Sequence, residues 1–493
     1  MSNQATEDET EAAPPVWDAA TSAAFRNELR ALNPWAAPYI DRIETLEGAG
    51  TWDVGDEILG SVQARSGEAR DLFEDLKYAI RDTALQRMAG GAAQWNAWAE
   101  PMEILGQRAK AGKTAASDDH MIWRLIAHTQ LFDLSFVRDC KFSKFVFPDA
   151  ATFDVAFGDK ETSPINVWLN EARFGGDAWF NGARFGGTAG FDQARFGGTA
   201  GFYGARFGGT AGFTGARFGD IALFNGARFG GDDPSAPAGS AYFQRTEWTR
   251  DANFNQCQIN CQLTFASAMF REAASFQSLV SRVGLSFADA SFAQVPDLTD
   301  AAFHVPPRLD NVRISEQQTV TSGHGTATRE PRERLPAAVL RLTRRLAHAD
   351  HSESEARFRA LRKAAIEAQD HERELAFFAA EVKARRFWTD QPWGRRVHLL
   401  VERGEYGRVE RAVDALTYAA TDVQPPPGLD EDDPPDRIVA KHIRSAGMGR
   451  FWFGLAYEWV SDFGRSLFRP LVAWAALICV FTALYASLHT EPA

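Results

Sequence analysis

Residues 172–207 read ARFGGDAWFNGARFGGTAGFDQARFGGTAGFYGARF. Phenylalanine recurs here at alternating steps of six and five residues, and this spacing runs without a miss from Phe174 to Phe229. An alanine stands two residues before each of these phenylalanines, so the unit is Ala-x-Phe-x-x with one extra residue in alternate units. A surface helix repeats at about 3.6 residues and a strand at about 2, and neither period fits this pattern. A fixed period of this kind predicts a solenoid of stacked, near-identical coils.

The same spacing extends beyond the perfect stretch. It continues from Phe243 to Phe303, with Ser281 as the polar exception, and it is already present from Phe136 to Phe153. If two 11-residue units make one coil, the lattice would hold about seven coils. Two segments rich in glycine, proline and acids interrupt it, and we expect them to be loops that project from the coil. These interruptions are residues 158–166 and 230–240.

The repeat unit resembles the Ala-x-Leu/Phe-x-x unit of the pentapeptide-repeat family, in a Phe-rich form with steps of five and six. The resemblance covers roughly residues 132–303 and implies a right-handed, four-sided β-helix with the phenylalanine and the preceding alanine pointing inward. The residues fit this picture, since stacked rings gain about 0.5–1.5 kcal/mol per pair beyond their burial and leave room only for a small neighbour. We expect Gly-Gly pairs such as Gly197–Gly198 to supply turns with positive φ.

One arginine precedes the core phenylalanine of every second unit and should therefore point outward. If a coil takes about 22 residues, these arginines stack in two columns on opposite faces. Stacked cations repel one another, so an anionic partner or interleaved acids would be stabilising. In the alternative interpretation, the arginines bind no partner: their aliphatic stems cover apolar surface and their charged ends are solvated. The candidate partner surface consists of Arg173, Arg195 and Arg217 in one column and Arg184, Arg206 and Arg228 in the other.

The sequence carries no recognisable catalytic motif: P-loop, GxSxG, HExxH and CxxC patterns are all missing. Cys257 and Cys261 have no histidine nearby, and Cys140 and Cys257 occupy the alanine position of the lattice, so filling the core explains them better than zinc does. We therefore expect no catalytic, cofactor-binding or metal-ligating residues. The net charge of −12 disfavours general nucleic-acid binding.

The chain outside the lattice predicts helices, linkers and one apolar segment. Residues 353–388 have the apolar stripe of one long charged helix, and 361–386 look like the helix that follows the β-helix in a membrane-bound branch of the family. We expect these regions: a disordered acidic N-terminus at 1–16, a helical domain that caps the first coil at 17–129, the β-helix at 130–304, a linker at 305–334, a helical region at 335–423, an acidic Pro-rich loop at 424–436, an amphipathic juxtamembrane segment at 437–467 and a transmembrane helix at 468–489.

The apolar segment 471–488 contains no charged residue. As a helix it would be about 27 Å long, close to the thickness of a bilayer core of about 30 Å. A buried core helix is the alternative. Residues 457–471 resemble the juxtamembrane motif of the same membrane-bound branch, and basic residues precede the span but do not follow it, which places the bulk of the chain on the cytoplasmic side of the inner membrane. The predicted anchor residues are Arg465, Arg469, Pro470 and Trp474.

Together these features predict a non-catalytic, membrane-anchored scaffold or protein-interaction module with the bilayer and an unidentified protein as partners. An oligomeric channel or transport subunit is an alternative, and a homo-oligomer stays open, because one helix of a monomer cannot line a pore. Some family members resemble DNA and modulate topoisomerases. That second alternative is disfavoured, because residues 171–230 carry six arginines and four acids, a net charge of +2.

Overall fold

The computed structural model describes residues 17–50, 67–111, 118–157, 164–231, 239–314, 353–388 and 468–489. Its contacts divide the chain into two units. Unit 1 comprises Met1–Ala290 and Ala302–Val305, and unit 2 comprises Ser291–Ala301 and Pro306–Ala493. Several predicted regions lie outside the described residues, in whole or in part. They are the N-terminus at 1–16, the loop residues 158–163 and 232–238, the linker after 314, residues 335–352 and 389–423 of the helical region, the acidic loop at 424–436 and the juxtamembrane segment at 437–467.

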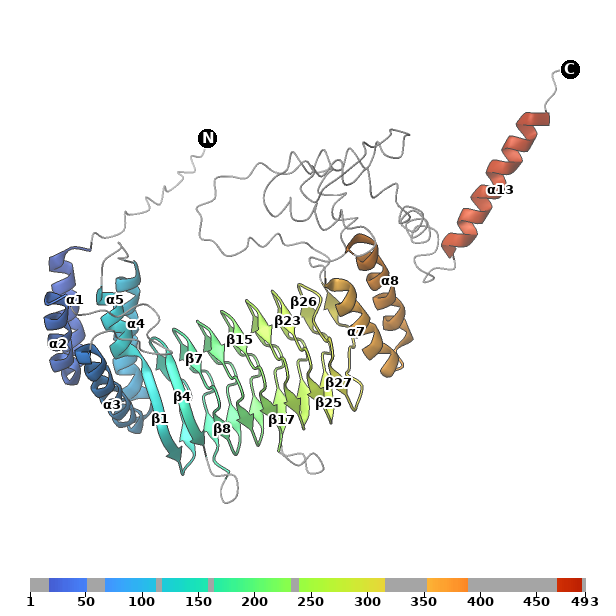
Figure 1. Ribbon diagram of the computed structural model, residues 1–493. Coiled ribbons are helices and arrows are strands. Elements are labelled where there is room, and N and C mark those ends of the chain that lie inside the picture. Colours follow the sequence, from blue (N-terminus) through green and yellow to red (C-terminus); the bar gives the residue numbers. More distant parts are fainter. Residues whose placement is uncertain are drawn as a thin grey trace, which may run out of the picture. The chain divides into compact units, whose positions relative to one another are not determined.

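Unit 1 begins with helices that share a core around Phe25, Leu29, Ile40 and Trp123 (Figure 1). Asp18 accepts a hydrogen bond from the backbone N–H of Thr21 and so caps the first helix. The described helices of this unit are α1 (Ala19–Leu32), the 3₁₀ turn η1 (Pro34–Ala36), α2 (Ala37–Gly48), α3 (Gly67–Ala89), α4 (Gly91–Ala111) and α5 (Asp118–Ala127).

Helix α4 closes the edge of the first coil of strands. Trp95 Nε1 donates to the carbonyl oxygen of Val146 at 2.6 Å, and its ring packs against Phe145 and Phe147. Asn96 Oδ1 accepts from the Val146 N–H at 2.9 Å. Backbone groups that an open sheet edge would expose are thus satisfied by side chains of the helix.

The strands of unit 1 are parallel and form four faces, visited in order around each turn (Figure 1). Face 1 holds β4 (Ala151–Phe157, its first half), β7 (Ala178–Trp179), β11 (Ala200–Gly201), β15 (Ala222–Leu223), β19 (Ala252–Asn253) and β23 (Ala274–Ser275). Face 2 holds the second half of β4, β8 (Arg184–Phe185), β12 (Arg206–Phe207), β16 (Arg228–Phe229), β20 (Gln258–Ile259), β24 (Val280–Ser281) and β27 (Ala302–Phe303). Face 3 holds β2 (Cys140–Lys141), β5 (Val167–Trp168), β9 (Ala189–Gly190), β13 (Ala211–Gly212), β17 (Ser240–Tyr242), β21 (Gln262–Thr264) and β25 (Gly284–Ser286). Face 4 holds β3 (Val146–Phe147), β6 (Arg173–Phe174), β10 (Arg195–Phe196), β14 (Arg217–Phe218), β18 (Glu247–Trp248) and β22 (Met269–Phe270).

Residues that stack in neighbouring turns of the regular stretch are 22 positions apart, as in the pairing of Arg195 with Arg173 and Arg217. Strand β4 pairs with β7 through Ala151 and with β8 through Phe157, so it runs around one corner. Strand β1 (Thr129–Phe136) adds to β4 at the N-terminal edge. This confirms the predicted β-solenoid flanked by helices. It has about eight turns, where the spacing predicted about seven.

The lattice residues fill the interior as the sequence predicts. Every alanine and phenylalanine of the regular stretch is at most 2% exposed, and Ser281 is fully buried as well. Phe202 shows the packing: its ring stacks on Phe180 and Phe224 at 4.9 and 4.6 Å between centroids. Rings from the opposite faces 1 and 3 meet edge to face across the interior, as Phe202 and Phe213 do at 5.5 Å. Continuous aromatic ladders therefore form the core.

The two repeat lengths correspond to two kinds of corner. In the five-residue step the residue before the alanine adopts positive φ, and this recurs every 11 residues in the regular stretch, from Glu171 and Gly182 to Gln193 and Gly204. The six-residue step contains the Gly-Gly pair, for example Gly197–Gly198, and neither glycine of this pair has a positive φ. The prediction that Gly-Gly pairs supply left-handed turns was therefore wrong, because the extra residue lets the corner turn without a left-handed residue.

The Gly-Gly pairs are needed for a different reason, which is close approach between coils. A Cβ atom at Gly198 would lie 2.7 Å from the carbonyl carbon of Gly176, and one at Gly209 would lie 2.5 Å from the carbonyl oxygen of Gly187. Both neighbours are backbone atoms of the preceding coil. Any side chain at these positions would push the coils apart.

In unit 2, strands β26 (Ser291–Phe292) and β28 (Arg313–Ile314) pair in parallel. The predicted single helix over 353–388 is two helices, α7 (Ser354–Glu367) and α8 (His371–Trp388). Gln369 takes a left-handed conformation, with φ of 56°. Asp370 Oδ1 then accepts from the N–H of Arg373 and caps α8. The prediction of one helix was wrong because this local cap outweighs an apolar stripe that continues in phase.

Helices α7 and α8 are joined by a network around one buried acid. The Glu381 carboxylate of α8 forms ion pairs with two arginines of α7, Arg359 at 3.1 Å and Arg362 at 2.7 Å. Helix α13 (Phe468–His489) covers the segment in which the sequence predicts a membrane span. Over the residues described, none of the helices has both the length and the apolar character that crossing a membrane demands.

Candidate interaction surface

The six arginines form the two columns that the spacing predicts. Residues Arg173, Arg195 and Arg217 are register neighbours on face 4. Their counterparts on face 2 are also register neighbours, with Arg206 paired to both others. Each arginine precedes a buried phenylalanine in its strand, so its own side chain points to solvent. The members on face 2 are Arg184, Arg206 and Arg228.

Acidic side chains close both ends of the face 4 column. At one end Glu103 of α4 lies 3.9 Å from Arg173, and at the other Glu247 lies 3.7 Å from Arg217. Glu247 follows Arg217 in register and also binds Arg271 at 2.5 Å. Within the described ranges, the central Arg195 makes no ion pair. The column is thus neutralised at its ends and cationic at its centre.

A strip of bare backbone runs beside this column. Gly175, Gly197 and Gly219 follow the three arginine-phenylalanine pairs, and all three are exposed. Their N–H groups are already used: Gly197 donates to the Phe174 carbonyl at 2.8 Å and Gly219 to the Phe196 carbonyl at 2.7 Å. An anion on this face would therefore be bound by guanidinium groups and not by free amides.

Residues 169–216 and 191–233 match a family model for pentapeptide repeats, in 9 copies. This part of the chain is a pentapeptide-repeat solenoid. All six arginines lie inside the matched residues. No curated protein and no solved structure matches the chain.

Acids within the pentapeptide-repeat solenoid serve its structure. Asp192 Oδ1 accepts from the N–H of Thr214 at 2.8 Å, and Asp177 Oδ1 accepts from the N–H of Thr199 at 2.9 Å. Both bonds join residues 22 positions apart, so each carboxylate ties one coil to the next. These carboxylates are committed to backbone partners and do not converge on a shared point.

The cysteines of the solenoid are buried thiols. Burial raises the pKa of Cys140 and of Cys261 to about 12. It raises the pKa of Cys257 as well, and this thiol donates to the carbonyl oxygen of Phe224 at 3.0 Å. A thiol with such a pKa is a poor nucleophile and a poor metal ligand at neutral pH. No cluster of three potential metal ligands occurs in the described part of the chain.

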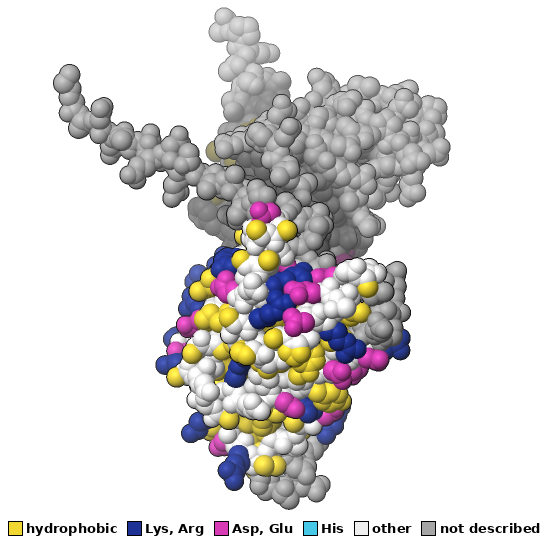
Figure 2. Space-filling model, turned by 90° about the vertical axis from the view of Figure 1, so that its left-hand side faces the viewer, with side chains coloured by type: hydrophobic (Ala, Val, Ile, Leu, Met, Phe, Trp, Pro, Cys, Tyr) yellow, Lys and Arg dark blue, Asp and Glu magenta, His cyan; other side chains and the backbone are white. Residues whose placement is uncertain are grey.

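The helical end of unit 1 carries no concentration of one charge. Figure 2 shows lysine and arginine side chains interspersed with acids across this end. Several are paired, such as Arg26 with Glu47 at 2.6 Å and Arg30 with Asp41 at 2.8 Å. A polyanion such as nucleic acid finds no continuous basic surface here.

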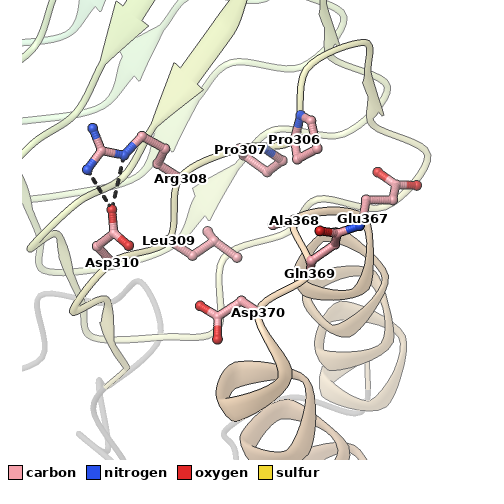
Figure 3. A pocket seen from close by; sticks show the side chains of 9 residues that line it. All are labelled: Pro306, Pro307, Arg308, Leu309, Asp310, Glu367, Ala368, Gln369 and Asp370. Atoms are coloured by element: carbon pink, nitrogen blue, oxygen red, sulfur yellow. Dashed lines mark hydrogen bonds and ion pairs between the residues drawn. The ribbon is translucent and has the colours of Figure 1, made fainter.

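Unit 2 contains a pocket of about 290 Å³ (Figure 3). It is lined by the segment Pro306–Asp310 and by the turn Glu367–Asp370 between α7 and α8. Arg308 and Asp310 bind each other at 2.8 Å, and Asp370 binds Arg373 at 2.7 Å. Glu367 of the lining also lies 3.9 Å from Lys363, so all the charged side chains that line this pocket have a partner among the described residues.

Proposed function

We propose that this protein is a non-catalytic interaction module whose pentapeptide-repeat solenoid presents its faces to a protein partner. The observation that carries the proposal is the face 4 column, in which the exposed Arg195 lies between Arg173 and Arg217 and makes no ion pair with any described residue. Like charges held in register are unfavourable in the free protein, and an anionic partner would offset that repulsion. A rigid ladder fixes the spacing of these charges and so favours one partner geometry over another.

The interior of the solenoid supports a role without catalysis. Stacked aromatic rings fill it, and Asp177 and Asp192 serve as ties between coils. A catalytic site needs an acid, a base or a nucleophile that converge on one point. The carboxylates of Asp177 and Asp192 bind backbone N–H groups of the next coil instead.

We also propose that residues 468–489 attach the module to the cytoplasmic membrane. The support is the uncharged run at 471–488 and the exposed apolar side chains of α13, such as Trp474 at 71% and Leu477 at 58%. Arg469, Pro470 and Trp474 lie in α13, and Arg465 lies outside the described residues. Carbonate extraction of membranes tests this: the full chain should stay in the pellet and a variant lacking 468–489 should not. Release of both proteins would refute the attachment.

The interaction role can be tested by photo-crosslinking in cells. A photoreactive phenylalanine at Tyr203 or Thr249 would report on neighbours of faces 1 and 4. We expect discrete adducts of defined mass in the native chain. We expect these adducts to disappear when the six arginines of the two columns are changed to glutamine. Adducts that persist unchanged in that variant, or no adduct from either position, would refute the proposal.

A further inference from the structure

We propose that face 4 of the solenoid binds a short acidic peptide segment, with carboxylates at alternate positions of an extended chain. This inference rests on the proposed interaction function and names its partner. The binding groups are the guanidiniums of Arg173, Arg195 and Arg217, which occupy equivalent positions in three successive parallel strands. Arginine presents a planar fork that can bind a carboxylate through two hydrogen bonds.

The dimensions of the column fit such a segment. Neighbouring parallel strands lie about 4.8 Å apart, so three arginines span about 10 Å along the solenoid. In an extended peptide the side chains of residues i and i+2 lie on the same side, about 6.7 Å apart. A Glu-x-Glu or Asp-x-Asp segment running along the column would thus place two carboxylates against three flexible guanidinium groups. Arg195, at the centre, would contact both.

The acids at the two ends select against a long polyanion. Glu103 stands beside Arg173, and Glu247 occupies the next register position after Arg217. A nucleic acid that follows the column would carry phosphates past at least one of these carboxylates, where like charges repel. A peptide with two carboxylates about 6.7 Å apart fits within the column and ends before it reaches them. The closed column therefore favours an acidic peptide.

The glycine strip leaves room for the peptide backbone. Gly175, Gly197 and Gly219 project no side chain, so an extended chain could lie flat next to the arginines. The peptide would not join the sheet as an added strand, because the N–H groups of Gly175 and Gly197 already bind the previous coil. Side-chain charges, and not backbone pairing, would supply the affinity and make it dependent on salt.

Face 2 provides a matched control within the same molecule. Arg184, Arg206 and Arg228 have the same register but a less open surrounding, since Gly186 and Gly208 are half-buried, as is Arg206 itself. An Arg206→Gln substitution removes the same charge from the same coil position, one half-turn away. It separates a site on face 4 from a general loss of positive charge.

The experiment measures fluorescence anisotropy of a labelled peptide with one Glu-x-Glu segment, added to the full chain at two salt concentrations. We expect Arg195→Gln to weaken binding about tenfold and Arg206→Gln to weaken it less than about twofold. We expect Glu247→Gln to strengthen binding about two- to threefold, because Arg217 is released. The same peptide with glutamine in place of glutamate should not bind. Circular dichroism of each variant checks that the exposed substitutions leave the fold intact.

Two outcomes would overturn the inference: equal losses in Arg195→Gln and Arg206→Gln, or a single-stranded oligonucleotide that competes better than the peptide. Failure of this inference differs from failure of the proposed function. If the cellular adducts of the native chain persist in Arg195→Gln and vanish only in the sixfold variant, the module binds a partner by another face. If the native chain gives no adducts, the proposed function itself is refuted.

Discussion

Alanine at Gly209 should destabilise the solenoid more than alanine at Gly204, although only Gly204 has a left-handed backbone. At Gly209 the new Cβ would lie 2.5 Å from the carbonyl oxygen and 2.6 Å from the carbonyl carbon of Gly187. Ordinary contact begins at 3.4 Å, so these backbones must separate by about 0.9 Å. The adjacent bond from the Gly208 N–H to the Phe185 carbonyl is 2.7 Å long and resists that movement.

The expected cost at Gly209 is about 3 kcal/mol, the upper part of the range for overpacking of a tight interior. At Gly204 a Cβ would meet no atom within 4 Å, and φ is 63°. The penalty there is the intrinsic cost of a left-handed residue, about 1–2 kcal/mol. Asparagine tolerates this conformation better than alanine does, so Gly204→Asn should cost still less. Gly209→Asn should cost at least as much as Gly209→Ala.

Urea unfolding followed by circular dichroism gives the midpoint and the free energy of unfolding for all four variants. The native chain under the same conditions is the reference. The reasoning fails if Gly204→Ala is as destabilising as Gly209→Ala, or if asparagine is tolerated equally at both positions. Either result would mean that the Gly-Gly pairs are required for their backbone conformation after all.

Two further predictions concern buried side chains. Phe202→Ala should lower the free energy of unfolding by about 3–5 kcal/mol, and Phe202→Leu by clearly less, because the ring lies between Phe180 and Phe224; equal urea midpoints for the two variants would contradict this. Burial lowers the pKa of His128 to about 3, and its ring bonds to Thr152 Oγ1 at 3.0 Å. The unfolded chain therefore takes up a proton below pH 6.5 that the folded chain does not, which costs about 2 kcal/mol of stability at pH 5. His128→Gln should reduce the loss of stability between pH 7 and pH 5 by that amount in the same assay, and an unchanged difference would refute it.

The parts of the fold that follow from spacing could be predicted from the sequence. Arg173 and Arg195 are 22 residues apart in the sequence, which is the length of one turn of the solenoid. The spacing alone therefore predicted both arginine columns and the inward-pointing phenylalanines. The two roles of glycine could not be separated this way, since one residue type serves both a left-handed turn and a close approach. A signal was present nonetheless: Gln193 stands where Gly204 and Gly215 stand in other units, and a left-handed residue tolerates such exchange better than a crowded position does.

The ends of the arginine column were beyond the reach of the repeat pattern. Glu103 comes from a helix of the N-terminal region, and nothing in the lattice indicates which helical residue meets Arg173. Glu247 follows Arg217 by 30 positions and not 22, because the interruption at 230–240 lengthens that turn. The step from Phe229 to Phe243 is 14 residues where the lattice has 6, and subtracting these eight extra residues places Glu247 in the column. The break between α7 and α8 was harder to predict from the sequence, because only Gln369 and Asp370 indicate it.

These end positions bear on what the column does. If the arginines served only to cover apolar surface with their aliphatic stems, there would be no reason for acidic side chains to lie specifically at the two ends of the column. Instead Glu103 and Glu247 hold the two outer arginines, and the cationic part of face 4 is restricted to its centre. Glu247 also forms an ion pair with Arg271, which holds its carboxylate at the end of the column. An arrangement that leaves the unpaired positive charge at the centre of a rigid column of about 10 Å would set the length, as well as the sign, of the acidic peptide that we propose.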